Sequence, residues 1–486
     1  MKHRHSLGAW IALVILALAA GCEGDTIALY PNSVYPGGPG QGIVTVNSDY
    51  TDSTVSVVDR LSGTLGIPEI ASSTGSAGLS SPLSGDVVPA RAPNPFGAII
   101  LLDRSNANLT FVGPGTRQIE DQFSARTNVG DPNPNPSDAL VVDGGRIYVS
   151  RQGRFNFGAA TAFDDENSND VVEMDPVTGA LTEVPAFDFN VSFGAAGTGQ
   201  VDTANADYAR PNRLLRIGNY VAAILLNLDG GFDGTGGTGL VAILDPATDT
   251  LVDATPTTAG TTDPVVIEDG ADVCQGPGGG ASYLPESGIL YIACSGIPGN
   301  FFSPANGDYA GQLANSMVVA VDFSPLAAGG DVTVTEIALA SDFYPGATPG
   351  TQQSPLSGAV QVVSPTLGFA VVYGTFGCGA DPCVPDNSAP PANVSSAVLS
   401  FNPTSGTVYT TAIISGGPYE LGGLLGDALT SRAYLADGQF VSPKVRVIDF
   451  DAALSGGVIG TASENVAAAF VPNSRPGQAP RELAYY

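Results

Sequence analysis

Histidine, tryptophan and lysine are nearly absent from this chain of 486 residues. Both histidines and the single tryptophan lie within the first ten residues, and Lys444 is the only lysine after Lys2. A protein cut after that start would have no imidazole for a Ser-His-Asp triad, for zinc or for haem. Schiff-base chemistry would have one candidate, Lys444, which lies in a segment patterned like an ordinary strand.

Basic residues are also scarce, since 18 Lys and Arg face 47 Asp and Glu, for a formal net charge of −29. Nucleic-acid binding needs a basic surface, and an acidic chain is repelled by anionic lipid. The composition therefore argues against a nucleic-acid partner and against a membrane-surface binder. It favours solubility and the attraction of cations.

The start of the chain predicts export. Lys2 and Arg4 precede an apolar run over residues 7–20, which is short for a membrane span and typical of a secretory signal. The run ends in LAAGC, which resembles the lipobox of bacterial lipoproteins. The resemblance implies cleavage after residue 21 and lipid on Cys22, which together with further acyl chains gives stable anchoring. The alternative is a plain signal peptide with an incidental cysteine.

We therefore expect a signal peptide over 1–21, a lipidated cysteine and flexible tether over 22–42, and one domain over 43–486. The expected location is the bacterial cell envelope, with the outer membrane or cell surface favoured over the inner membrane. The tether is predicted from its glycine, proline and asparagine content.

One pattern recurs seven times along the chain. An alternating β-branched strand ends in Asp or Asn, a turn follows, and a second strand begins. Asp and Asn bond their own backbone in such turns, proline presets φ, and glycine accepts positive φ. The turn residues of the seven copies are Asp59, Asp103, Asp175, Asp245, Asp322, Asn402 and Asp449.

Two further strand-like segments precede most copies, so each unit predicts a four-stranded antiparallel sheet. Seven such units indicate an all-β fold, a seven-bladed β-propeller, in which radial repetition avoids long open sheet edges. The first unit lacks an inner strand, and Pro480–Tyr486 is patterned like one. We expect this C-terminal strand to close the ring. A β-sandwich or a β-helix is the alternative.

The segment GIVTVNSDYTDSTVSVVDRLSGTL, residues 42–65, resembles the YVTN-type repeat of bacterial surface-protein β-propellers. VVEMDPVTGAL and VAILDPATDTL match the second half of that repeat. The resemblance covers most of residues 42–486 in degenerate copies. It implies a propeller fold and an envelope location, and it implies no reaction, since propellers host many functions.

Long insertions are predicted after the second strands of units three to six, at 151–170, 227–239, 295–316 and 374–395. Insertions gathered on one face of a repeat fold often mark its binding face.

Four cysteines of an exported protein favour two disulfides, although CGADPC also allows a metal site. Three pairings are possible, and proximity favours Cys274–Cys294 and Cys378–Cys383.

Two loops are candidate Ca²⁺ sites, because they combine carboxylates with asparagine or glycine. Their carboxylates are Asp164, Asp165, Asp170, Asp229 and Asp233. Solvated acidic loops are the alternative.

Three arginines of units three and four are candidates for an anionic ligand: Arg151, Arg154 and Arg213. Pairing with nearby carboxylates is the alternative.

These features together favour a membrane-anchored, non-enzymatic binding or scaffold protein with an envelope protein or glycan as partner. The alternative is a carboxylate- and Ca²⁺-dependent hydrolase or lactonase on the loop-rich face. A component of a secretion or surface complex is a third interpretation.

Overall fold

The structure is a computed structural model that divides into the units Met1–Tyr30 and Pro31–Tyr486. The described residues all belong to the second unit, so the predicted signal peptide and Cys22 lie outside them. They are 42–60, 64–73, 80–92, 98–113, 118–153, 168–203, 207–229, 236–258, 260–296, 309–343, 352–353, 355–377, 393–417, 420–428, 430–439, 443–450 and 479–485.

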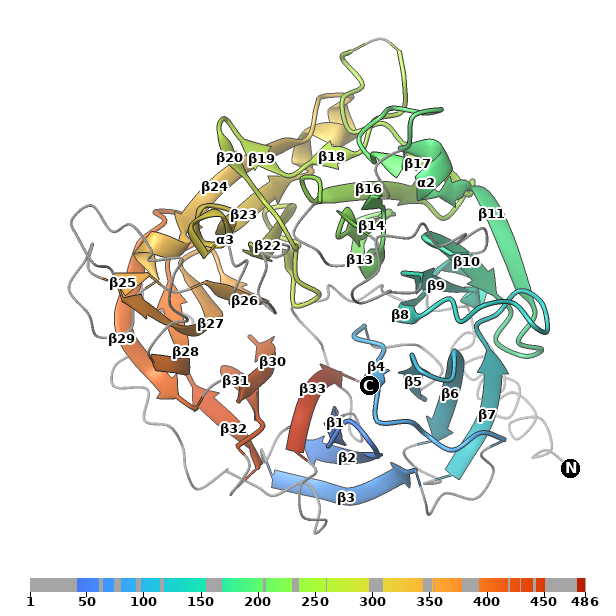
Figure 1. The fold of residues 1–486 in the computed structure, drawn as a ribbon, viewed down its shortest axis with the longest axis horizontal. Coiled ribbons are helices and arrows are strands. Elements are labelled where there is room, and N and C mark those ends of the chain that lie inside the picture. The colour runs from blue at the N-terminus through green and yellow to red at the C-terminus, as the bar shows by residue number, and fades with distance from the viewer. Residues whose placement is uncertain are drawn as a thin grey trace, which may run out of the picture. The chain divides into compact units, whose positions relative to one another are not determined.

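The second unit is a seven-bladed β-propeller whose antiparallel sheets surround a central axis (Figure 1). From the axis outward, the first three blades are β33 (Ala479–Tyr485), β1 (Gly42–Ser48), β2 (Ser53–Asp59) and β3 (Thr64–Ser72); β4 (Val87–Pro89), β5 (Ile99–Asp103), β6 (Asn108–Gly113) and β7 (Gln118–Ser124); and β8 (Pro136–Val141), β9 (Ile147–Arg151), β10 (Asp170–Met174) and β11 (Leu181–Asp188).

Blades four to six repeat the order. They are β13 (Pro211–Ile217), β14 (Tyr220–Leu225), β16 (Leu240–Asp245) and β17 (Thr250–Val252); β21 (Ser282–Leu284), β22 (Ile289–Ser295), β23 (Ser316–Asp322) and β24 (Thr333–Leu339); and β26 (Leu356–Ser364), β27 (Leu367–Gly377), β28 (Asn393–Phe401) and β29 (Val408–Ser415). Blade seven is described as β30 (Leu421–Asp427), β31 (Arg432–Asp437) and β32 (Lys444–Asp449).

Several short elements lie outside the main strands of the seven blades. They are the strands β12 (Asp207–Tyr208), β15 (Leu228–Asp229), β18 (Val265–Val266), β19 (Glu268–Asp269), β20 (Asp272–Val273) and β25 (Gln352–Gln353), the helices α2 (Phe189–Ser192) and α3 (Tyr309–Ala314), and the 3₁₀ turns η1 (Asp143–Gly145), η3 (Ser324–Ala328) and η4 (Ala340–Asp342). No helix in the described ranges is long and apolar enough to cross a bilayer.

The hydrophobic cores lie between blades. Val44 and Val46 of β1, for example, are buried in one cluster with Ile99 and Leu101 of β5. A strand covered on both faces by neighbouring blades buries its alternating residues on each side, and every residue of β1 is buried. This packing explains why the sequence has so many β-branched residues in these strands.

The ring is closed by the end of the chain, as the sequence predicts. β33 pairs antiparallel with β1, with Leu483 opposite Thr45 and Tyr485 opposite Ile43. Figure 1 shows β33 as the innermost strand beside β1. The first and last segments of the propeller therefore share one sheet.

One repeat copy occupies a different place from the one predicted. Asp59, Asp245, Asp322 and Asp449 end third strands of their blades, whereas Asp103 ends β5, a second strand. In most copies two strands precede the strand that ends in Asp or Asn, whereas only β4 precedes β5 in its blade. Direct pairing of β5 with β4 overrides the local signal of the Asp turn.

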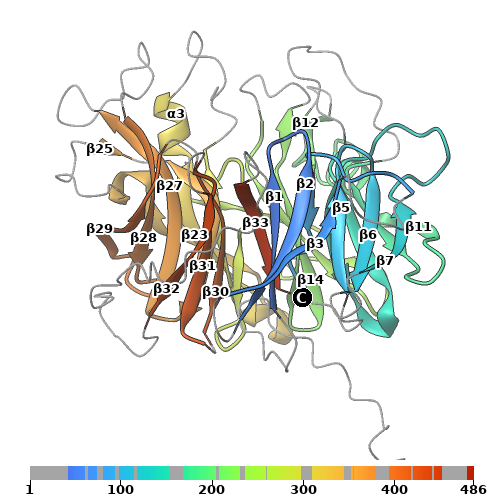
Figure 2. The same cartoon turned by 90° about the horizontal axis from the view of Figure 1, so that it is seen from below.

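The long connections follow second strands, as expected. β9 ends at Arg151 and β10 begins at Asp170, and the same step from β22 to β23 spans 295–316. Because all second strands run in the same direction, these connections leave from one face of the ring, which we call the loop face. Figure 2 shows α3, β12 and β25 on this face.

Candidate functional site

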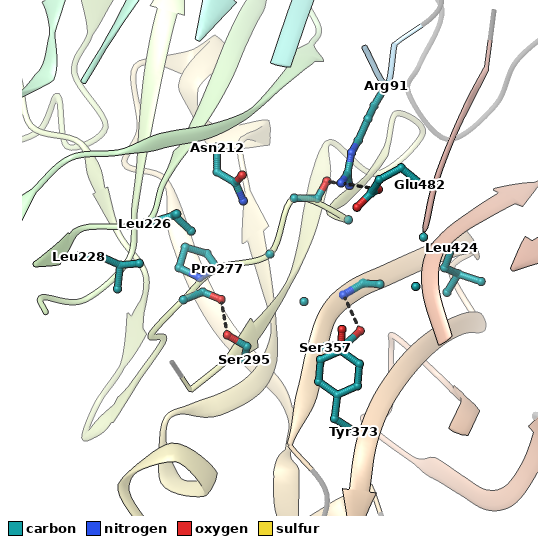
Figure 3. A pocket seen from close by; sticks show the side chains of 18 of the residues that line it. Arg91, Asn212, Leu226, Leu228, Pro277, Ser295, Ser357, Tyr373, Leu424 and Glu482 are labelled. Carbon is teal, nitrogen blue, oxygen red and sulfur yellow. Dashed lines mark hydrogen bonds and ion pairs between the residues drawn. The ribbon is translucent and has the colours of Figure 1, made fainter. Parts of the chain in front are cut away.

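A cavity of about 310 Å³ opens at the centre of the loop face. Figure 3 shows its lining from close by. Its lining comes from blades one, two, four, five, six and seven, which meet only around the axis. Part of the lining lies at the starts of inner strands, such as Asn212 and Ser357, or towards the ends of second strands, such as Ser295 and Tyr373. Leu424 and Glu482 lie further along inner strands. We call this cavity the channel-mouth pocket. It lies on the face that the insertions predicted for binding.

An ion pair crosses the floor of this pocket. Arg91, just after β4, donates from Nη2 to Glu482 Oε2 of β33 at 2.9 Å, and its Nη1 donates to the Gly279 carbonyl oxygen. The side chains of Arg91 and Glu482 are 24% and 27% exposed, so both remain accessible from the cavity. One guanidinium thus joins blade two to blade one and to blade five across the axis.

Glycine backbones form the walls beside this pair. A Cβ on Gly278 would lie 1.9 Å from the Gly358 carbonyl oxygen, and one on Gly423 would lie 2.9 Å from the backbone nitrogen of Leu483. Inner strands converge on the axis, so side chains at these positions would collide with neighbouring blades. The QGPGGGA run before β21 therefore lets backbone approach backbone around the pocket.

A disulfide holds the start of that wall. Cys274 is bonded to Cys294 of β22, with their Cα atoms 5.4 Å apart. The following residues run along β22, where the Ser295 hydroxyl donates to the Gly276 carbonyl oxygen at 3.0 Å and Gly278 N donates to the Ala293 carbonyl oxygen at 2.8 Å. The predicted Cys274–Cys294 bridge is confirmed, whereas Cys378 and Cys383 lie outside the described residues.

The pocket has polar and apolar walls (Figure 3). Its apolar side chains are Leu226, Leu228, Pro277 and Leu424, from blades four, five and seven. Tyr373 adds an aromatic ring. The polar groups make up the larger part of the lining, and the apolar side chains add hydrophobic surface to it.

Arg213, a predicted ligand-binding residue, lies on β13 outside the lining of this pocket. Its Nη1 donates to Asp138 Oδ2 of β8 at 2.8 Å, and both side chains are buried. Burial lowers the pKa of Arg213 to about 10, against the opposing effect of the Asp138 carboxylate, so the group stays cationic at neutral pH. Its visible role is to join blades three and four.

The structure brings together two residues that the sequence assigned to different sites. Arg151 Nε donates to Asp170 Oδ1 at 2.7 Å, and the Arg151 side chain is fully buried. Burial raises the pKa of Asp170, and the Arg151 guanidinium opposes that shift. Arg151 is therefore paired with a carboxylate, which was the alternative to binding an anionic ligand. Asp170, a candidate calcium ligand, is the carboxylate in this pair.

The other candidates divide as follows. Asp229 lies in β15, whose backbone pairs with β12. Arg154, Asp164, Asp165 and Asp233 lie outside the described residues. Within the described ranges, no group of three or more Asp, Glu, Cys or His side chains is gathered as a metal site.

The fold defines a seven-bladed β-propeller with a pocket at its channel mouth. No family model matches the chain, and no curated relative matches it. Solved structures with low similarity include a proposed 6-phosphogluconolactonase from Bacteroides fragilis and a protein from Lactobacillus plantarum. Each is 11% identical with a TM-score of 0.48 over 92% of this chain, covering 98% and 99% of theirs. Apo AztD from Citrobacter koseri is 10% identical, with a TM-score of 0.38 over 92% of this chain and 98% of its own.

Sequence reasoning missed the residues that form the pocket. Arg91 and Glu482 are 391 residues apart and belong to no recognisable motif. The glycine run Gly278–Gly280 before an inner strand was a usable signal, because a strand start rich in glycine indicates close approach of another backbone.

Proposed function

We propose that this protein is a lipid-anchored component of the bacterial envelope, of the YVTN-type propeller lipoproteins, that binds a ligand at its channel-mouth pocket. The lipobox-like segment before Cys22 supports the anchor. Binding, in this proposal, requires no chemical step.

One observation carries the binding role: the pocket of about 310 Å³ combines an accessible Arg91–Glu482 pair with apolar walls on the loop face. Ligand sites are typically concave and combine hydrophobic surface with fixed polar groups that orient the ligand. Interblade contacts and the Cys274–Cys294 disulfide hold these groups in place before any ligand arrives. Such preorganisation lowers the entropy cost of binding.

The binding role is tested by filling the pocket. Ser357→Trp places an indole in the cavity, and Ser287→Trp places one in the β21–β22 turn at the opposite face. Native mass spectrometry of protein incubated with an extract of envelope small molecules should show a compound retained by the wild type and by Ser287→Trp. Retention by Ser357→Trp to the same extent would refute binding in this pocket.

The anchor is tested separately. Cys22→Ser should abolish labelling by radioactive palmitate and leave the precursor uncleaved, because thioether attachment needs the cysteine sulfur and the lipoprotein peptidase cuts next to the lipidated cysteine. Cys378→Ser, which changes another cysteine, is the matched control and should keep the label. Normal labelling of Cys22→Ser would refute lipidation at this residue.

The alternative, a Ca²⁺-dependent hydrolase or lactonase, depends on Asp164, Asp165 and Asp233 outside the described residues. Calorimetric titration with CaCl₂ measures the cation directly. Stoichiometric binding that is lost in the double variant Asp164→Asn and Asp165→Asn would favour this alternative, and its absence at millimolar calcium would count against it.

A further inference from the structure

We propose that the channel-mouth pocket recognises a neutral, polyhydroxylated ligand, a free sugar or the terminal residue of a glycan. This inference rests on the proposed binding function and names its ligand class. The arrangement of charge, hydrogen-bonding groups and apolar walls around the cavity carries it.

The charges that line the pocket are balanced. Arg91 is paired with Glu482, and Arg104, the other guanidinium of the lining, donates from Nε to Asp86 Oδ1 at 2.9 Å. An anion would meet two cations whose charge is already neutralised, inside a chain of net charge −29. A cation would meet one carboxylate, Glu482, which is already paired with Arg91. The electrostatics therefore favours a ligand without net charge.

The Arg91–Glu482 pair has the hydrogen-bonding character that a diol needs. A hydroxyl both donates and accepts, and a guanidinium beside a carboxylate offers donors and acceptors side by side. Hydrogen bonds to charged groups are also stronger than those between neutral groups. Adjacent hydroxyls of a sugar can donate to Glu482 and accept from Arg91 without breaking the charge balance. Asn212 and Ser357 supply further polar groups around the same cavity.

The remaining walls suit the carbon skeleton of a sugar ring. Leu226, Pro277 and Leu424 present apolar surface, and Tyr373 presents an aromatic ring. The C–H groups of a sugar are buried against such surfaces, which adds a hydrophobic contribution to the hydrogen bonds.

Saturation-transfer NMR and calorimetry on the mature propeller test this directly. The neutral probes are D-glucose, D-galactose, D-mannose and N-acetyl-D-glucosamine, each as the free sugar and as a tetrasaccharide. The charged analogues are D-gluconate and glucose 6-phosphate. At least one neutral probe should bind more tightly than both charged analogues. Tighter binding of the tetrasaccharide identifies a glycan end, and equal binding identifies the free sugar.

Glu482→Gln supplies the discriminating variant, because it keeps the shape of the side chain and gives the pocket one net positive charge. The neutral sugar should bind about tenfold more weakly, as expected for loss of a hydrogen bond to a charged group. D-Gluconate should bind more tightly than it does to the wild type. Glu286→Gln, in the exposed β21–β22 turn of the opposite face, removes the same charge and should change neither affinity.

Melting temperatures establish that the variants are folded, and Arg91→Lys provides a second variant if Glu482→Gln is not. Arg91→Lys keeps the positive charge but removes the planar guanidinium. The affinity for the neutral sugar should therefore fall, and the affinity for D-gluconate should not rise. The inference is wrong if no neutral probe binds, or if a charged analogue binds more tightly to the wild type. If Ser357→Trp still abolishes retention of a different compound from the extract, the proposed binding function stands while the sugar assignment falls.

Discussion

Arg60 and Asp427 form a buried ion pair although 367 residues separate them. Arg60 follows β2 in blade one, and Asp427 ends β30, the inner strand of blade seven. Arg60 Nη2 donates to Asp427 Oδ1 at 2.7 Å, and the Tyr434 hydroxyl donates to the Arg60 carbonyl oxygen at 2.8 Å. The pair therefore joins the N-terminal strands of blade one to blade seven, next to the sheet in which β33 closes the ring.

Asp427→Asn should destabilise the propeller strongly, because it leaves the buried Arg60 cation without its counter-charge. Removing one member of a buried pair costs about 3–5 kcal/mol. Asp449→Asn is the matched control, since Asp449 also ends a blade-seven strand but is 49% exposed in its pair with Arg432. Asp449→Asn should lower the free energy of unfolding by less than about 1 kcal/mol. Urea unfolding measures both, and equal losses would refute a special role for the seam.

Deleting Pro480–Tyr486 should lower the unfolding midpoint far more than trimming a loose end does. The deletion removes the inner strand of blade one, with Leu483 and Tyr485 both buried. Loss of a buried side chain of this size costs about 2–5 kcal/mol. Thermal unfolding of the unlipidated domain with and without these residues is the measurement. An unchanged midpoint would contradict closure by β33.

The double variant Cys274→Ala and Cys294→Ala should lose about 3 kcal/mol of stability, because the disulfide closes a loop across a sequence separation of 20 residues. Chemical unfolding measures this loss. Since the disulfide holds the start of the glycine wall, the variant should also weaken binding in the pocket.

Non-reducing peptide mapping of the wild type should show Cys378 joined to Cys383, and free thiols at these two positions would refute that second pairing.

Glu336→Gln should stabilise the protein at neutral pH. Burial and the neighbouring carboxylates, Asp272 among them, raise the pKa of Glu336 above its ordinary value. The folded state therefore holds this proton more tightly than the unfolded state, and stability falls as pH rises from the ordinary pKa through the raised one.

The amide variant should lose its advantage below the ordinary pKa of glutamate, where the wild-type carboxyl is protonated in both states. Unfolding free energies measured from pH 3 to pH 8 test this dependence. A difference between Glu336→Gln and wild type that does not vary with pH would contradict the shift.

The sequence by itself determined the fold class, the blade count and the closure. Period-two strands and Asp turns are local features, so segments such as those ending at Asp59 and Asp245 identify hairpins without knowledge of their neighbours. The predicted Cys274–Cys294 disulfide also followed from proximity in the chain. The missing inner strand of the first blade made the C-terminal segment its natural complement.

Only the tertiary structure decided which charges meet. Arg91 of blade two pairs with Glu482 of the neighbouring blade one, and Arg151 pairs with Asp170 rather than with an external ligand. Asp103 likewise ends a second strand because β5 pairs directly with β4, the inner strand of its blade. The physical reason is that ion pairing and cavity formation depend on distances through space between blades. Those distances are fixed only when the ring closes, and local sequence carries no record of them.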